Sequence, residues 1–158
     1  MLYLINEVIN LSNRDIIEKE NIKLNVYAKD WKEAVREAGN LLLSSEYINE
    51  EYIEDMVKAV EDLGPYIVIV PHIAIAHARP TNEVLKNGMS LITLEKPVEF
   101  GSEDNDPVDM VFAFCARSKE NHLEALQELV GILDNEKKIE RLRNTEDIEE
   151  AYYILNRK

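Results

Sequence analysis

Two apolar stretches in the middle of the chain constrain its fold more than any other feature. Residues 67–70 read IVIV and residues 73–76 read IAIA, with only Pro71 and His72 between them. A continuous β-branched run is typical of a strand that lies inside a sheet with both faces covered. Proline lacks the N–H that would continue a ladder, so Pro71 should end the first run. The sequence therefore predicts a strand over residues 67–70 and a second over residues 73–76 that leads directly into His77.

Other patterns predict further strands and a set of helices. Alternating or apolar residues predict strands over residues 22–26, 90–94 and 108–114. Helical spacing and capping residues predict a short helix over residues 2–9, one capped by Asp30, one running from Asn49 to Gly64, one capped by Ser118 and a last one capped by Thr145. Strands in the middle with helices before and after them indicate an α/β fold, in which a mixed central β-sheet is sandwiched between helices.

Length, charge and composition limit the possible functions. The 158 residues contain no Pro/Gly/Ser-rich linker, so residues 1–158 are expected to form a single domain. A formal charge of −13 disfavours nucleic acid and anionic lipid as partners. The N-terminus lacks the pattern of a signal peptide, and no stretch is long enough to insert into a membrane. The lone Cys115 fits a reducing compartment, and a cytoplasmic protein is the simplest expectation.

His77 is the histidine whose surroundings best suit chemistry. It follows the second predicted strand, and its neighbours Ala76 and Ala78 leave space around an imidazole. Arg79 offers a planar set of donors to phosphate oxygens. A neutral imidazole is a nucleophile, and its phosphoryl derivative is labile, which suits a carrier that must give the group away. The tripeptide His-x-Arg is common, however, so other parts of the sequence are needed to show whether His77 is a functional residue.

His122 supplies part of that context. It falls near the first turn of the helix capped by Ser118, where unpaired N–H groups and the helix dipole favour an anion. The residues expected to face inward on this helix are Leu123, Leu126, Leu129, Val130 and Leu133. Sharing a side with Leu126 and Leu129, His122 should point inward or along a groove. The spacing fits equally well a partly buried histidine bonded to a carbonyl.

Several motifs in a fixed order resemble the phosphotransferase-system EIIA type-2 domains, the mannitol/fructose-type IIA family. Residues 64–80 (GPYIVIVPHIAIAHARP) resemble the phosphorylation-site signature of that family. The later landmarks are Ser90-Leu91, residues 97–101 (PVEFG), residues 105–108 (NDPV) and His122-Leu123. The sequences of residues 64–66 and 105–108 are most similar to the ascorbate-type branch of the family.

The resemblance implies a specific activity, that of a phosphotransferase. In the family, the histidine at the position of His77 accepts a phosphoryl group from HPr and passes it to a IIB component, which serves sugar uptake through a membrane IIC component. The histidine at the position of His122 helps to hold the phosphoryl group, and Arg79 is a candidate donor to its oxygens. The resemblance further implies the mixed sheet flanked by helices, and no metal or organic cofactor.

Two positions depart from the usual family pattern. His72 stands where such loops commonly have glycine, and Ala76 stands where proline is frequent. If the backbone at residue 72 has a positive φ, histidine is one of the less costly replacements for glycine. His72 is then either an exposed loop residue or a second phosphoacceptor or donor.

Three other interpretations stay open at this stage. The first is a IIA-like regulatory module controlled by histidine phosphorylation. The second is a metal-dependent hydrolase, whose ligands would be His72, His77 and His122 with Asp104 or Asp106. No His-x-His, His-Glu-x-x-His or Cys-x-x-Cys spacing supports such a site, and Arg79 would disfavour a cation. The third is a scaffold domain, because most of the acidic residues lie on predicted solvated helix faces.

Overall fold

The computed structural model describes residues 15–157. Its strands are β1 (Ile22–Val26), β2 (Ile73–Ala76), β3 (Gly88–Val98) and β4 (Val108–Cys115). Its helices are the short 3-10 helix η1 (Lys19–Asn21) and the α-helices α2 (Trp31–Ser44), α3 (Glu50–Leu63), α4 (Lys119–Leu133), α5 (Glu136–Asn144) and α6 (Ile148–Asn156). None of the helices within these residues is long and apolar enough to cross a lipid bilayer.

The four strands form one mixed sheet in the order β1-β3-β4-β2. β1 runs parallel to β3, and β2 runs parallel to β4, whereas β3 and β4 are antiparallel. The predicted α/β class with a mixed central sheet is confirmed. Because β2 and β4 run in the same direction, their carboxyl ends meet at the same edge of the sheet. The segments that follow both strands must therefore begin side by side.

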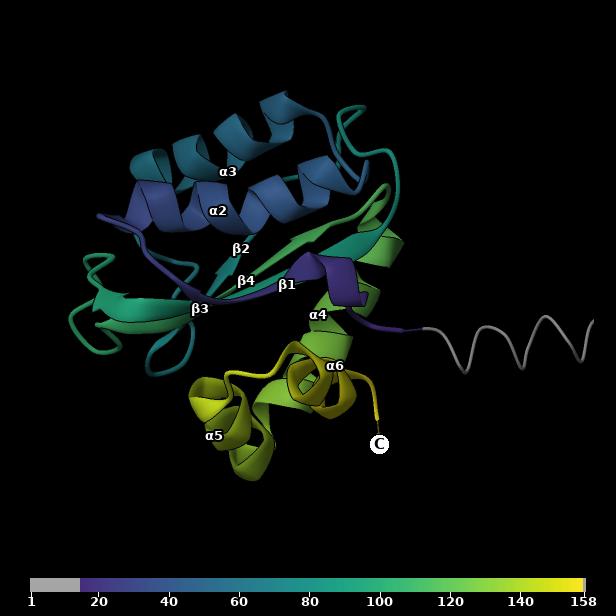
Figure 1. Cartoon of the computed structure of the whole chain (residues 1–158). Helices are drawn as coiled ribbons and strands as arrows, with labels where there is room; N and C mark the ends of the chain where they lie inside the picture. Colours follow the sequence, from purple (N-terminus) through teal and green to yellow (C-terminus); the bar gives the residue numbers. More distant parts are fainter. Residues whose placement is uncertain (1–14, 158) are drawn as a thin grey trace, which may run out of the picture.

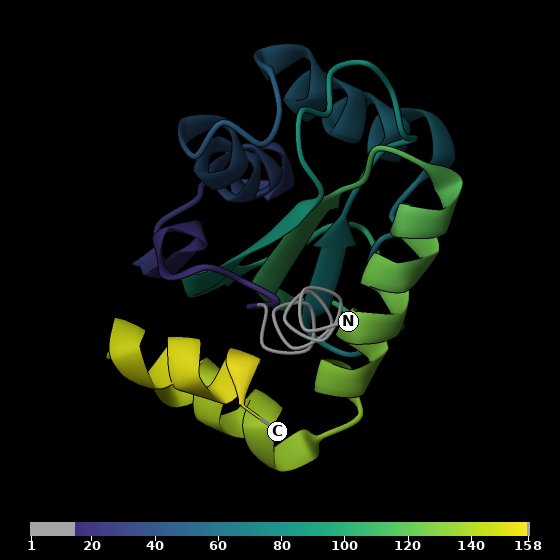
Figure 2. The same ribbon diagram turned by 90° about the vertical axis from the view of Figure 1, so that its right-hand side faces the viewer.

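Helices cover both faces of the sheet (Figure 1). One core lies between the sheet and the pair α2 and α3, and a second lies between the sheet and α4, α5 and α6. Successive residues of β4 alternate between them: Val111 and Ala113 face the first core, and Phe112 and Phe114 face the second. Figure 2 shows α4 running along one flank of the sheet toward α5 and α6. The alternation follows from the two-residue period of a strand.

The first two α-helices form as the sequence predicts. The carboxylate of Asp30 accepts a hydrogen bond from the backbone N–H of Glu33 and so caps α2. Gly64 ends α3 with a φ of 83°, a conformation that glycine adopts without a steric penalty. The inward face of α3 is buried and comprises Tyr52, Ile53, Met56, Val57 and Val60.

The strand predicted over residues 67–70 is wrong. Ile67 and Val68 are buried, but they belong to a loop, and Ile69 is 53% exposed. This loop folds back along β2, where the N–H of Ile75 donates to the carbonyl of Ile67. A short apolar run shows that a segment is buried but not whether it pairs in a sheet. The second run, residues 73–76, forms the edge strand β2 instead.

The predictions for the last third of the chain are partly wrong. α5 was not predicted, because it is short and strongly polar and only Ile139 and Leu142 are buried in it. α6 is capped by Asp147, not by Thr145, whose hydroxyl instead accepts from the N–H of Asp147. On α4, Leu123 and Val130 are more than half exposed, so they do not face inward. The short helix predicted over residues 2–9 lies outside the described residues.

Candidate functional site

The sheet topology brings His77 and His122 together. His77 directly follows β2, and His122 lies in the first turns of α4, which begins shortly after β4. Ile73 and Ile75 of β2 pack into the core beside α4, and the strand alternation continues this direction at His77. The two imidazole rings lie with their centroids 5.5 Å apart at an interplanar angle of 74°. The parallel pairing of β2 and β4 thus places the two histidines in one site.

Aromatic rings hold the imidazole of His77 on two further sides. Phe114 of β4 stacks on it, with ring centroids 4.9 Å apart and an interplanar angle of 14°. Tyr66, from the loop after α3, approaches edge-on at 5.6 Å. Phe114 is fully buried, whereas Tyr66 is 40% exposed. The ring of His77 is therefore fixed on a rigid apolar platform and is reached from the side of Tyr66 and His122.

One hydrogen bond determines which nitrogen of His77 carries the proton. Nδ1 lies 2.8 Å from the carbonyl oxygen of Ile75. A carbonyl oxygen only accepts hydrogen bonds, so Nδ1 must be the protonated nitrogen. Burial lowers the pKa of His77 and outweighs the Ile75 bond, which raises it, and the nearby His122 lowers it further. The ring is therefore neutral at physiological pH, with an unprotonated Nε2 that has the lone pair of a nucleophile.

His122 lies beside the imidazole of His77, in a position set by a helix cap. The hydroxyl of Ser118 accepts from the N–H of Asn121, and the N–H of His122 donates to the carbonyl of Ser118. Burial lowers the pKa of His122, so this ring is neutral as well. Its Nδ1 is buried and has no hydrogen-bond partner within residues 15–157. A buried ring nitrogen without a partner is available to a group that enters the site.

A cavity of about 630 Å³ opens in front of the two imidazoles. Its basic side chains are Lys58, Arg79 and Lys119, and its acidic ones are Asp55 and Asp62. Arg79 is exposed, and no ion pair joins it to another residue of the described part of the chain. The lining thus has three basic side chains against two acidic ones, whereas the whole chain has a net charge of −13. Such a cavity suits an anionic group.

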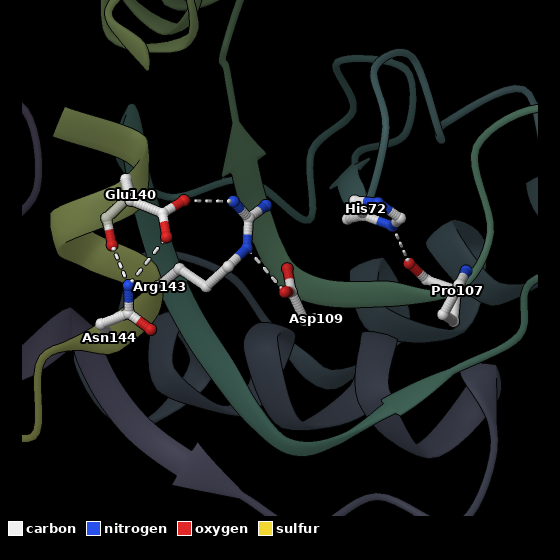
Figure 3. A network of polar contacts seen from close by, with 6 residues as sticks. All are labelled: His72, Pro107, Asp109, Glu140, Arg143 and Asn144. Atoms are coloured by element: carbon white, nitrogen blue, oxygen red, sulfur yellow. Dashed lines mark hydrogen bonds and ion pairs between the residues drawn. The ribbon is translucent and has the colours of Figure 1, made fainter. Parts of the chain in front are cut away.

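His72 lies at the opposite end of β2 from His77. Five residues of extended chain separate them by roughly 15 Å. The φ of His72 is 70°, as expected for a position where glycine is usual, and its Nδ1 lies 2.8 Å from the carbonyl of Pro107. Figure 3 shows this contact near the ion pair of Asp109 and Arg143. His72 therefore takes no part in the site around His77.

The metal site considered from the sequence is not assembled. Its three histidines are split between the two ends of β2, and no group of three or more His, Cys, Asp or Glu side chains among residues 15–157 is arranged to hold a metal ion. The carboxylate of Asp106 instead accepts from the backbone N–H groups of Phe100, Gly101 and Ser102. Asp106 therefore organises a loop.

Comparisons with known proteins identify the family of the chain. Residues 15–158 match the family described as phosphoenolpyruvate-dependent sugar phosphotransferase system, EIIA 2. The chain belongs to this EIIA 2 family. The ascorbate-specific EIIA component of Salmonella choleraesuis is 36% identical over 143 residues, which is 90% of this chain and 93% of that protein. His77, His122 and Arg79 all lie within residues 15–158, which match the family.

Solved structures of EIIA proteins share the fold. The mannitol-specific cryptic phosphotransferase enzyme IIA of Escherichia coli superposes with a TM-score of 0.81 at 32% identity, covering 90% of this chain and 97% of that one. The mannitol enzyme IIA of Escherichia coli in complex with phosphorylated enzyme IIB superposes with a TM-score of 0.78 at 32% identity, covering 88% and 96%. The predicted family is thereby confirmed, and the protein is an EIIA component of a sugar phosphotransferase system.

The sequence interpretation missed three aromatic residues of this EIIA site. Phe114 and Tyr66 contact the ring of His77, and Tyr52 of α3 bonds the backbone next to it. None of the three was named as a site residue, because apolar periodicity does not distinguish a ring that fills space from a ring that supports a histidine. The pairing of β2 with β4 would have been the signal, since it places Phe114 beside His77.

Proposed function

We propose that Nε2 of His77 accepts a phosphoryl group from phosphorylated HPr and passes it to a IIB component. The single observation that carries this proposal is the bond between His77 Nδ1 and the carbonyl of Ile75, which leaves Nε2 as a lone-pair donor. In the transfer, that lone pair forms the N–P bond while the bond between phosphorus and its leaving atom on the donor breaks. The electron pair of the broken bond returns to the donor.

His122 and Arg79 have the role of stabilising the phosphoryl group. A phosphoryl group on His77 brings negative charge beside His122, and opposite charge raises the pKa of an imidazole. Phosphorylation is thus expected to protonate His122, so that the ring becomes a charged donor to the phosphoryl oxygens. Arg79 lines the same cavity and can supply two parallel N–H donors. The N–H groups of the first turn of α4 add the positive end of a helix dipole.

The rim of the cavity supports a protein as the reaction partner. Leu63 and Tyr66 line the cavity and are 70% and 40% exposed, and Leu123, which is 58% exposed, follows His122 directly. Exposed apolar side chains around a polar centre are typical of surfaces that bind proteins. The partner's phosphorylated residue must reach into the cavity while these side chains are covered. The relay is proposed to operate in the cytoplasm, in the reducing environment that the lone Cys115 fits.

The specificity named for the relatives extends the proposal to the sugar that the system transports. The ascorbate-specific EIIA component that matches 90% of this chain supports an ascorbate-type IIB component as acceptor. Purified IIB components of an ascorbate system and of a mannitol system, offered to the phosphorylated chain at equal concentration, test this. Faster transfer to the ascorbate-type IIB is expected, and equal or reversed rates would contradict the sugar assignment. Stable phosphorylation without transfer to either would instead indicate the regulatory module.

The phosphorylation itself is tested by labelling from phosphoenolpyruvate through the two general proteins of the relay. His77→Gln should abolish the label, because the amide has no nucleophilic lone pair. His122→Gln should accept the label on the order of 10² times more slowly, the usual loss when one donor to a developing anion is removed. Circular dichroism of both variants controls for folding. Full labelling of His77→Gln would refute the assignment of the phosphoacceptor.

A further inference from the structure

The side chain of Tyr52 makes an unusual set of contacts just behind the phosphoacceptor site. Tyr52 lies on α3 and is fully buried. Its hydroxyl oxygen lies 2.9 Å from the carbonyl oxygen of Phe114 and 3.3 Å from that of Ala78. The same oxygen lies 3.0 Å from the backbone nitrogen of Ala78, whose N–H donates to it. One phenol thus contacts the residue after His77 and the residue that stacks on His77.

The donor and acceptor roles of this hydroxyl follow from its single proton. The proton goes to the carbonyl of Phe114, which is the nearer of the two acceptors, and the oxygen lone pair accepts from the N–H of Ala78. Burial raises the pKa of Tyr52 strongly, so the hydroxyl keeps its proton at physiological pH. The phenol therefore bridges two backbone segments through one donated and one accepted hydrogen bond.

These two backbone segments diverge where β2 and β4 end, at the carboxyl end of their pairing. Ala76 and Ala113 are the last paired residues of β2 and β4, so beyond them no ladder hydrogen bond holds the strands together. Ala78 and Phe114 lie just past this point. Phe114 directs its ring into the core beside α4, where His77 stacks on it, while Tyr52 packs in the core on the other face. The hydroxyl of Tyr52 replaces the missing ladder bonds.

We propose that Tyr52 is a positioning residue for phosphoryl transfer, because it fixes the backbone after His77 against the strand that carries the stacking ring. It does not touch the imidazole itself. Through Ala78 it sets the orientation of His77 toward its acceptor at Ile75, and through Phe114 it sets the platform under the ring. The distance between the nucleophile and His122 depends on both. This inference rests on the proposed function of His77, of which it names a supporting residue.

The test compares Tyr52→Phe with Thr93→Val. Tyr52→Phe removes only the hydroxyl and keeps the ring. Thr93 is another buried hydroxyl, which accepts from the N–H of Asn25 at 2.9 Å, and it pairs with Met110 near the other end of β4. Thr93→Val loses one hydrogen bond with a backbone group, whereas Tyr52→Phe loses two, one donated to Phe114 and one accepted from Ala78. Thr93→Val therefore controls for the loss of a bonded hydroxyl in the sheet region without changing the backbone at Ala78.

Two readouts distinguish positioning from stability. The nitrogen-15 spectrum of the His77 imidazole should show a protonated Nδ1 in the parent chain and in Thr93→Val, and a mixture of the two tautomers in Tyr52→Phe. The kcat for phosphorylation should fall about tenfold in Tyr52→Phe with KM changed less than twofold, because the imidazole loses its orientation while the partner surface is intact. Both assays are run well below the Tm of each variant.

The outcomes separate this inference from the proposed function. A parent chain that takes no label contradicts the proposed function, whereas the spectrum still reports whether Tyr52 orients His77. Tyr52→Phe with the tautomer and kcat of the parent overturns the positioning role, and so do equal losses in Tyr52→Phe and Thr93→Val. The parent chain alone gives a further test, because the amide of Ala78 should exchange with solvent as slowly as the amides of β4. Fast exchange there overturns the inference.

Discussion

The two ends of β2 each present a histidine, and they show how differently the same side chain can be used. At the carboxyl end, His77 stacks on Phe114, faces His122 and opens on a cavity with three basic side chains. At the amino end, His72 is an exposed turn residue with a positive φ, and its ring bonds the carbonyl of Pro107. Both rings use Nδ1 for a backbone carbonyl, so the tautomer alone does not distinguish them.

The difference lies in what surrounds the free Nε2. The ring of His77 is desolvated, which keeps it neutral, and is held by two aromatic rings and a second imidazole. Beside His72, Figure 3 shows the carbonyl of Pro107, which its Nδ1 contacts, and farther along the ion pair of Asp109 and Arg143. The carboxyl end of β2 can therefore hold a phosphoryl group because the imidazole there is held rigidly, is desolvated and has basic side chains nearby, such as Arg79, which forms no ion pair within residues 15–157.

The sharpest test of this comparison places the same residue at both ends. His77→Gly should abolish labelling. His72→Gly should label within about twofold of the parent, because residue 72 lies at the other end of β2, roughly 15 Å from His77. At residue 72 glycine relieves the positive φ but adds freedom to the unfolded chain, so stability should change by less than about 1 kcal/mol. Labelling and urea unfolding measure the two effects. A label that depends on His72 would revive its role as a second phosphoacceptor.

The pH dependence of the carboxyl end gives a second, smaller effect. The pKa values of His77 and His122 are both lowered, so below pH ~6.5 the unfolded chain binds protons that the folded chain does not. Their contribution to stability is complete above pH ~6.5 and is lost as the pH falls through the folded pKa values. NMR titration of the two rings should give midpoints below ~6.5, and His77→Gln should flatten the decline of unfolding free energy on acidification. A midpoint above ~6.5 for His77 would contradict its desolvation.

The same contrast explains which parts of the site the sequence could predict. His77 and His122 were identified because the strand end, the cap at Ser118 and the ordered family motifs are local patterns. The proximity of the two rings follows from the parallel pairing of β2 and β4, which no local pattern encodes. Phe114 and Tyr52 were missed for the same reason. Their functional contacts join strands and helices that are distant in sequence.

The errors in the fold have a related cause. The run over residues 67–70 has the composition of a buried strand, and Ile67 and Val68 are buried, but β2 is the edge strand of the sheet and the run forms a loop beside it. On α4, Leu123 and Val130 lie three and four residues from the partly buried Leu126, yet both are exposed. Leu123 lies next to His122, where an exposed leucine suits a partner surface. Periodicity predicts an apolar face, but it does not say whether the chain itself or another protein covers that face.

The smallest expected effect concerns the cap that places His122. Ser118→Ala removes the acceptor for the N–H of Asn121 and should lower stability by about 1 kcal/mol, and Asp30→Ala removes the equivalent bond to Glu33 on α2 at a similar cost. Of these two helices, only α4 carries a site residue in its first turns, so only Ser118→Ala should slow phosphorylation, by a factor of about two to five. Matched thermal unfolding and labelling rates measure both variants. If the two caps changed the rate equally, the position of His122 would not depend on how α4 begins, and the carboxyl end of β2 would owe its function to His77 and its aromatic platform alone.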